Sequence, residues 1–445
     1  MRRTDRTATA IIAMKRTTIA PALKIINFLS IGLLYIFLYN SAMNFIVGIF
    51  GFLLSTQLGK HFFFPFSYLS GIRVDYLAPT LYAMDLISFV LLGSLFHEYR
   101  LIFSSIPRLV HKYMLSISIG LLCIILNFLL APSKELWIYT LLRLIQWIGV
   151  FIFFARYGAR SQVFVWLIWG IMCGAVIQLF LTLTQLSTRQ SMQGIMYWLG
   201  ERQFSIATPS IAKAVIAGKE FLRPYGSFSH PNSLAGFYLL LYSFVLTQKN
   251  TIQPIVRFLL LLISSALVVI SFSRAAIVVY AVVNLVYFLQ IPSRCKWCVV
   301  AKTSVVAFLF IIAFSISGDT QSFDKRLDFT HKAISIILQN PTTGTGLGGY
   351  LIAQHEYPQK FPIFFEQPVH SIYLYTIAQL GIPLSFLIFS YIALYIRPFL
   401  RYSSFVLPVL AVATTGAIDH YWLTLPQNLF LSATIFGILI ATHEK

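Results

Sequence analysis

The chain has 445 residues, of which 58% are hydrophobic and only 11% are charged, and its mean hydropathy is +0.78. Because about a quarter of the residues in a soluble domain are charged, this composition excludes an ordinary soluble enzyme and indicates a polytopic membrane protein. Lys and Arg number 33 against 14 Asp and Glu, which gives a net charge of +19. In a membrane protein this excess indicates cytoplasmic anchoring and contact with membrane lipids, and no nucleic-acid partner is expected.

A basic segment opens the chain and long apolar segments follow it. Residues 1–26 are predicted to be a basic cytoplasmic segment, which is retained with the first span and not cleaved as a signal peptide. Residues 27–445 are predicted to form a single membrane domain, and the fold class is all-α. About twelve spans are expected from the apolar segments at 27–56, 83–97, 113–131, 136–156, 162–184, 231–248, 255–272, 275–290, 303–317, 371–395, 403–418 and 424–442.

The basic residues orient these spans. With the N-terminus inside, 19 of the 33 Lys and Arg residues fall in short cytoplasmic segments, as the positive-inside rule requires. Both termini are then cytoplasmic, and the three long loops (57–82, 185–230 and 318–370) lie on the outer face, where we expect the working site. Short amphipathic helices are predicted within these loops, at 329–338 and at 211–221.

Three short motifs lie at the outer ends of spans: Arg-Pro-Tyr-Gly-Ser-Phe-Ser-His-Pro-Asn at 223–232, Ser-Phe-Ser-Arg-Ala at 271–275 and Val-His-Ser-Ile-Tyr-Leu at 369–374. Each precedes a helix that runs inward, and Ser229 or His230 is expected to cap the first of these helices. Helix N-termini favour anions. Arg223 and Arg274 beside two of them predict a site for a dianionic or pyrophosphate group. The alternative is that these arginines reach lipid phosphates at the interface.

His370 directly precedes the tenth span on the same face as the arginines. A histidine there can take a proton from an incoming hydroxyl group near neutral pH, or it can simply cap the helix. His61, His230, His331, His355 and His420 are also predicted to face outward and compete for the role of base. Neither an HExxH sequence nor carboxylates at metal-ligand spacing accompany these histidines, so no metal is expected.

Two further features have a structural and a functional interpretation. The glycine cluster at 344–349 can cradle phosphates or form a turn that closes an outer helix, and its lack of a P-loop Lys favours the turn. Arg143 lies inside a span, where a charge is costly. It can join the anion site or pair with a carboxylate such as Asp75 or Asp85, and we favour the pairing.

The motifs at 223–232, 271–275 and 369–374, with Arg326 followed by Asn-Pro-Thr-Thr-Gly-Thr-Gly at 340–346 and with Gln-Leu-Gly-Ile-Pro at 379–383, occur in a familiar order. In this order they resemble the O-antigen ligase and O-antigen polymerase superfamily of bacterial membrane enzymes. The resemblance covers roughly residues 200–395, and the twelve-span layout extends it to the whole chain.

This resemblance implies a GT-C-like, metal-independent, inverting glycosyltransferase of the bacterial cytoplasmic membrane, without a cofactor. It would transfer a glycan from an undecaprenyl-pyrophosphate-linked donor to an acceptor hydroxyl group of a glycan, lipid or protein outside that membrane. In that mechanism Arg223 and Arg274 hold the pyrophosphate and His370 activates the acceptor. Further assistants are expected among Arg326, Arg143, His230 and Asn232.

Two alternatives to an O-antigen ligase stay open. A polysaccharide polymerase of the same superfamily shares the motifs and differs in its acceptor. A transporter or flippase of an anionic lipid-linked substrate would use the same arginines for binding alone. The transporter predicts basic residues along a path through the membrane, whereas Arg143 is the one basic residue predicted to lie deep within a span.

Overall fold

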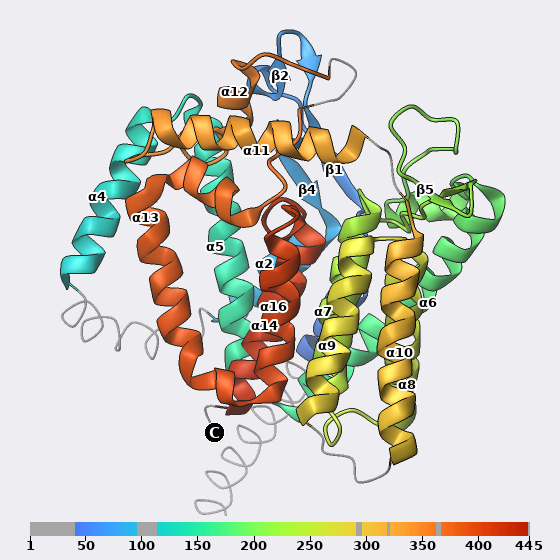
Figure 1. Cartoon of the computed structure of the whole chain (residues 1–445). Helices are drawn as coiled ribbons and strands as arrows, with labels where there is room; N and C mark the ends of the chain where they lie inside the picture. Colours follow the sequence, from blue (N-terminus) through green and yellow to red (C-terminus); the bar gives the residue numbers. More distant parts are fainter. Residues whose placement is uncertain (1–40, 96–113, 291–295, 318–320, 362–365, 444–445) are drawn as a thin grey trace, which may run out of the picture.

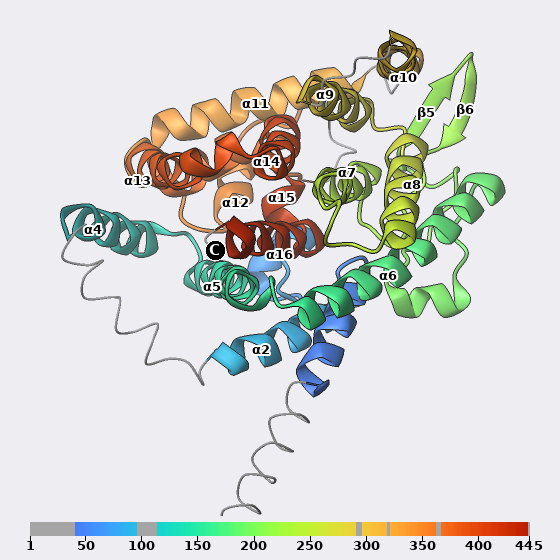
Figure 2. The same cartoon turned by 90° about the horizontal axis from the view of Figure 1, so that it is seen from below.

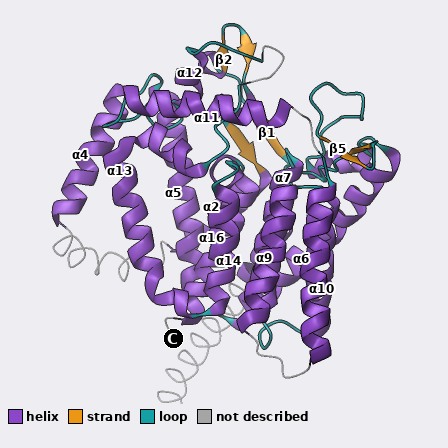
Figure 3. Ribbon diagram, viewed as in Figure 1, coloured by secondary structure: helices purple, strands orange, loops and turns teal. Residues whose placement is uncertain are grey.

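The computed structural model describes residues 41–95, 114–290, 296–317, 321–361 and 366–443, and within them the chain is mainly helical (Figures 1 and 3). The predicted segment 1–26 and the first part of the first span lie outside the described residues. The longer helices are Ser41–Leu53, α2 (Ala83–Leu95), α4 (Met114–Leu130), α5 (Lys134–Tyr157), α6 (Ser161–Thr188), α7 (Pro231–Thr247), α8 (Pro254–Ile270), α9 (Arg274–Gln290), α10 (Lys296–Ser315), α11 (Gln321–Gln339), α13 (Ile372–Ile396), α14 (Ser403–Gly416) and α16 (Pro426–His443).

A helix lies at each of the twelve predicted apolar segments, the first of which is described from Ser41 onward. Continuous apolar sequence favours helix in lipid because a helix satisfies its own backbone hydrogen bonds. Among the residues that the structure describes, three helices have both the length and the composition to cross a membrane: Lys134–Tyr157, Ser161–Thr188 and Ile372–Arg401. The remaining apolar helices are shorter, so the number of crossings stays a prediction.

The three long loops lie at the same end of the helix bundle (Figure 1). α11 runs across this end, nearly perpendicular to the bundle, and packs against α13. It includes the predicted amphipathic segment 329–338, which is confirmed as helix. The same end carries the short helices η1 (Pro65–Ser67), η2 (Asp75–Leu77), η4 (Gly194–Leu199), α12 (Tyr350–His355) and α15 (Tyr421–Thr424), while η5 (Arg397–Arg401) joins α13 to α14.

Short antiparallel strand pairings accompany the helices of this mainly helical chain. They pair β1 (Gly59–His61) with β4 (Thr80–Tyr82), β2 (Tyr68–Leu69) with β3 (Ile72–Arg73), and β5 (Lys213–Ile216) with β6 (Lys219–Leu222). The prediction of a surface helix at 211–221 was therefore wrong. The cause is the loop Ala217-Gly218, in which both residues have positive φ angles of 50° and 77°, the conformation of the tight turns that join adjacent strands.

α7 occupies the centre of the bundle, surrounded by α8, α9, α14 and α16 (Figure 2). Its side chains are buried on every side, including Leu234, Leu240 and Val245. A helix that is apolar around its whole circumference is stable in a protein core or in lipid, and here the neighbouring helices enclose it. This position fixes the N-terminus of α7, and with it the motif at 223–232, below the long loops.

The glycine cluster at 344–349 forms backbone hydrogen bonds with α13. The backbone N–H groups of Thr345 and Gly346 donate to the carbonyl groups of Ala378 and Gln379, over 2.9 and 3.0 Å. α13 is broken at Gly381, whose φ of 76° and contact with the backbone at Thr342 leave no room for a side chain. Because these amides already have partners, the cluster is a packing turn and not a phosphate cradle.

Candidate active site

The chain brings the beginning of α7 beside the loop between α8 and α9. Arg223 precedes α7 and donates from Nη2 to Oδ1 of Asn232 over 2.6 Å, and from Nε to the carbonyl oxygen of Ser271 over 3.0 Å. Asn232 lies in the first turn of α7, and Ser271 follows the last residue of α8. The Arg223 guanidinium is therefore held between two of the motifs that the sequence singled out.

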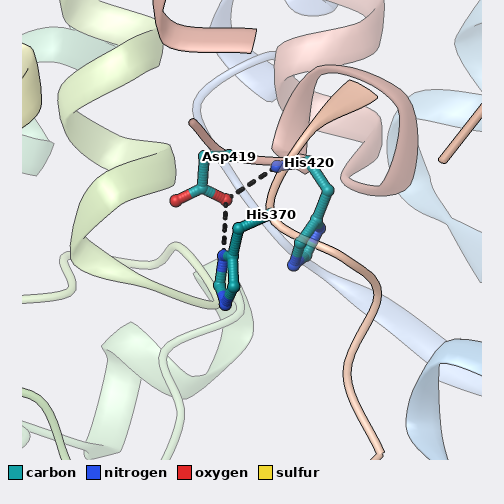
Figure 4. A group of neighbouring side chains, drawn as sticks. All are labelled: His370, Asp419 and His420. Carbon is teal, nitrogen blue, oxygen red and sulfur yellow. Dashed lines mark hydrogen bonds and ion pairs between the residues drawn. The ribbon is translucent and has the colours of Figure 1, made fainter. Parts of the chain in front are cut away.

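Asp419, in the linker between α14 and α15, connects this group to His370. Its Oδ2 atom accepts a hydrogen bond from Nδ2 of Asn232 over 2.9 Å. Its Oδ1 atom lies 3.7 Å from Nδ1 of His370 and accepts the backbone N–H of His420 over 2.8 Å (Figure 4). Nη2 of Arg326 lies 4.0 Å from Oδ2. The buried carboxylate of Asp419 thus lies near Arg326 and His370, and Asn232 connects it to Arg223.

The pKa of Asp419 follows from this position. Burial alone would raise it, but the His370 ring and the charges of His370, His420 and Arg326 lower the pKa well below its ordinary value. Asp419 is therefore ionised at every pH at which the enzyme is expected to work, and it favours an imidazole that presents Nδ1–H toward it.

His370 stands immediately before the N-cap of α13, where the Ser371 hydroxyl accepts the backbone N–H of Leu374. Ser371, and not His370, therefore makes the side-chain cap. The His370 side chain is 18% exposed, and its ring lies 5.3 Å from that of His420 and 6.3 Å from that of Phe329. The ring is thus fixed by its neighbours without being sealed from solvent.

His230 and His420 lie near the same carboxylate, but each already makes a hydrogen bond through Nδ1. Nδ1 of His230 accepts the backbone N–H of Asn232 over 3.1 Å and caps α7, as the sequence predicted. Nδ1 of His420 lies 2.7 Å from Oγ1 of Thr424. Burial lowers the pKa of each to about 3, and nearby positive charges (Arg223 for His230, Arg326 for both) act in the same direction, whereas Asp419 opposes them. Both rings are neutral at physiological pH.

The arginines form one positively charged region. Burial lowers the pKa of Arg223 to about 10; among the charged neighbours, Arg326 and Arg274 lower it, whereas Tyr225 and Asp419 raise it. Arg326 donates from Nη1 to the carbonyl oxygen of Ile418 over 2.9 Å, and Arg274 is exposed at the first residue of α9. Three guanidinium groups that repel one another at the end of a bundle provide an attractive site for a multiply charged anion.

Arg143 belongs to a different group of residues. From α5 it pairs with the carboxylate of Asp85, donates from Nε to the Tyr139 hydroxyl over 3.1 Å and bonds the Thr80 carbonyl oxygen. Pairing with Asp85 was the favoured prediction and is confirmed. Since a buried arginine needs such partners, Arg143 has a structural explanation independent of the anion site.

A cavity of about 950 Å³ opens beside the histidines. It is lined by His230, His370, Asp419 and His420, and further along by residues of the loops 57–82 and 185–230. Arg223, Arg274 and Arg326 are not among its lining residues. The histidines thus line a cavity that these three arginines do not reach, whereas Arg73, Arg143 and Arg202 are part of its lining.

The sequence model of the O-antigen ligase family matches residues 259–389. Over this segment the match confirms the predicted resemblance to the O-antigen ligase and polymerase superfamily. The matched segment contains Arg274, Arg326 and His370, whereas Arg223, Asn232 and Asp419 lie outside it. No curated protein matches the chain.

Outside the matched segment, two glutamines of α6 hold the motif at 223–232, and sequence reasoning missed both. The side-chain oxygen of Gln185 accepts the backbone N–H groups of Tyr225 and Gly226, both over 2.9 Å. The side-chain oxygen of Gln178 accepts the N–H of Ser227 over 2.9 Å, and its amide donates to the Ser227 hydroxyl over 2.7 Å. Buried amides are costly unless paired, so a glutamine in an apolar helix was a usable signal for such a clamp.

Sequence reasoning also missed Asp419. The signal available was an Asp-His pair at the outer end of a predicted span, in a chain with only 14 acidic residues. The nitrogen and oxygen atoms of His370, Asp419 and His420 that can bind a metal lie within 4.8 Å of one another. The flanking Arg326 and the hydrogen bond of His420 to Thr424 argue against a cation there, because a like charge nearby weakens cation binding.

Proposed function

We propose that this inner-membrane protein transfers a glycan from an undecaprenyl-pyrophosphate-linked donor to an acceptor hydroxyl group on the outer side of the cytoplasmic membrane. The observation that carries the proposal is the arrangement around Asp419, which lies beside His370 at a cavity, beside Arg326, and is joined to Arg223 through Asn232. The family match and the apolar helices agree with an O-antigen ligase-like enzyme of cell-surface polysaccharide biosynthesis.

The proposed step is a single displacement. The acceptor oxygen bonds to the anomeric carbon of the donor sugar as the bond from that carbon to the pyrophosphate oxygen breaks. The hydroxyl proton passes to Nε2 of His370, whose Nδ1 faces Asp419 at 3.7 Å, and the electron pair of the broken bond remains on undecaprenyl pyrophosphate. Attack opposite to the leaving group inverts the configuration at the anomeric carbon.

The arginines supply the stabilisation of the leaving group. Arg223 and Arg274, assisted by Arg326, would bind the pyrophosphate, on which negative charge develops in the transition state. Hydrogen-bond donors that are already in position stabilise the transition state more than the ground state, because the negative charge on the pyrophosphate increases as the bond breaks. Asn232 holds both Arg223 and Asp419, so it is a positioning residue for the two halves of the site. The proposed transfer therefore needs no metal.

A polymerase remains the alternative within the family, with a growing glycan in place of lipid A core as acceptor. A transporter is less well supported. Arg143, the deep basic residue that a transport path would use, is occupied by Asp85 and Tyr139.

Transfer by purified protein in lipid nanodiscs tests the proposal. Wild type and His370→Ala are mixed with lipid-linked donor and either rough lipopolysaccharide or the donor's own repeat glycan, with EDTA present. We expect His370→Ala to lose about 10² to 10⁴ in rate while it still binds donor, and His331→Ala, an exposed histidine of α11, to be unaffected. Normal turnover by His370→Ala would reject the base, and inhibition by EDTA would point to a metal at His370, Asp419 and His420.

A further inference from the structure

Two aromatic side chains stand exposed at the cavity. Tyr197 and Trp198, on η4 (Gly194–Leu199), are 59% and 67% exposed, yet both line the cavity that His230 and His370 also line. Large aromatic faces left exposed on the wall of a cavity are surfaces to which a ligand can add contacts.

The backbone that carries these rings is held firmly. The buried carboxylate of Glu201 accepts the backbone N–H groups of Met192 and Gln193, over 2.8 and 2.6 Å, and the amide of Gln185 over 2.8 Å. Gly200 closes η4 at a φ of 88°, and a Cβ atom there would lie 2.3 Å from the backbone of Gln57. Because the backbone is already ordered, a ligand that stacks on these rings loses little binding free energy to ordering the protein.

The residues that line the cavity indicate which of the two reactants it binds. In a single displacement the attacking oxygen and the leaving group lie on opposite sides of the anomeric carbon. The proposed function assigns the pyrophosphate to Arg223 and Arg274, which do not line the cavity, whereas the base His370 does. The arginines that do line the cavity already have partners: Arg73 pairs with Asp75, Arg143 pairs with Asp85, and Arg202 donates to the carbonyl oxygen of Ser229. The cavity therefore lies on the acceptor's side of the reaction.

We propose that this cavity is the acceptor subsite and that Tyr197 and Trp198 bind a sugar ring of the acceptor glycan by stacking. This inference rests on the proposed function. The volume of about 950 Å³ is at the upper end of small-molecule sites, which span about 300 to 1,000 Å³, so it fits more than one sugar. Arg202, Gln203 and Thr208 line the same cavity and offer hydrogen bonds to hydroxyl groups, as a carbohydrate requires beside an apolar platform.

Steady-state transfer separates this role from catalysis. At saturating donor, Trp198→Ala and Tyr197→Ala should each raise the KM for the acceptor about tenfold, the size of one aromatic contact, with kcat within about twofold and the donor KM unchanged. The matched control is Ile195→Ala, which is 76% exposed on the same short helix but does not line the cavity. An unchanged acceptor KM in both aromatic variants would overturn the proposal.

A binding measurement tests the acceptor subsite separately from the proposed role of His370 in catalysis. In a His370→Ala background, tryptophan fluorescence is titrated with delipidated core oligosaccharide and with the repeat-unit oligosaccharide released from the donor. A saturable change that disappears with Trp198→Phe supports the subsite, even if His370→Ala transfers normally and the proposed base is rejected. Quenching of Trp198 by brominated lipid in nanodiscs, without response to either oligosaccharide, would instead make η4 a membrane contact and overturn the proposal.

Discussion

Oδ1 of Asp419 lies 3.7 Å from Nδ1 of His370, and Oδ2 of the same carboxylate accepts a hydrogen bond from Asn232 over 2.9 Å. The distance to His370 is longer than a hydrogen bond, so the carboxylate acts on the imidazole through its charge. Because α7 fixes Asn232, the carboxylate can orient the imidazole with Nδ1–H toward itself. Nε2 is then left as the acceptor of a proton.

Replacing Asp419 tests this relationship. Asp419→Asn keeps the size of the side chain but removes its charge, so the imidazole loses the partner that selects its tautomer and that stabilises its protonated form. We expect kcat to fall about 10²-fold, with the donor Kd nearly unchanged, and Asp419→Glu to recover part of the loss. If Asp419→Asn instead weakens donor binding at normal kcat, the carboxylate serves only to position Arg223 and Arg326.

The arginines should respond according to geometry as well as charge. Lys keeps the charge but loses the planar fork that pairs with phosphate oxygens, so Arg274→Lys should be impaired and Arg274→Ala more so, by about 10²-fold in kcat. Arg223→Ala should behave similarly. Arg189→Ala is a control, since Arg189 is exposed at the end of α6. Full glycan transfer by the Ala variants at normal protein level would remove both residues from the site.

The sequence predicted the positions of the helices well because a long apolar segment has few structures available to it in lipid. It also singled out Arg223 and Asn232, which share the motif that leads into α7, and His370, which directly precedes the N-cap of α13. It could not place Asp419, which lies 187 residues from Asn232 and reaches it only through the packing of the α14–α15 linker on α7. The hairpin at β5 and β6 was missed because its two-residue turn outweighs the helical periodicity around it.

Stability should fall as the pH is lowered from about 7. Burial lowers the pKa of His230 and of His420 to about 3 from an ordinary 6.5. Below pH 6.5 the unfolded chain therefore binds protons that the folded chain excludes, so the free energy of unfolding decreases toward low pH. Asp419, whose ordinary pKa is 3.8, adds its own loss only below that value.

His230→Asn isolates one of these groups. Asn is a good N-cap and does not titrate, so the Tm of this variant should decline less between pH 7.5 and 4.5 than that of the wild type, with similar values at pH 7.5. Thermal unfolding of the purified proteins in detergent provides the measurement. Parallel Tm curves for the two proteins would show that proton exclusion at His230 contributes nothing to stability.

The orientation of the chain is the prediction on which the outward-facing site depends. The loops at 185–230 and 318–370 lie at the end of the bundle opposite to the connection between α7 and α8 (Figure 1), and the charge count places that connection inside. Ser187, Gln359 and Asn250 are all exposed. Cysteines at these positions, in a background with the four native cysteines replaced by serine, should therefore differ in their reaction with an impermeant thiol reagent.

We expect Ser187→Cys and Gln359→Cys to be labelled in intact spheroplasts, and Asn250→Cys to be labelled only after the membrane is made permeable. Labelling of all three after permeabilisation is the control for reactivity. Protection of the first two with labelling of Asn250→Cys would invert the topology. The arginines and His370 would then face the cytoplasm, where the transfer proposed here does not take place.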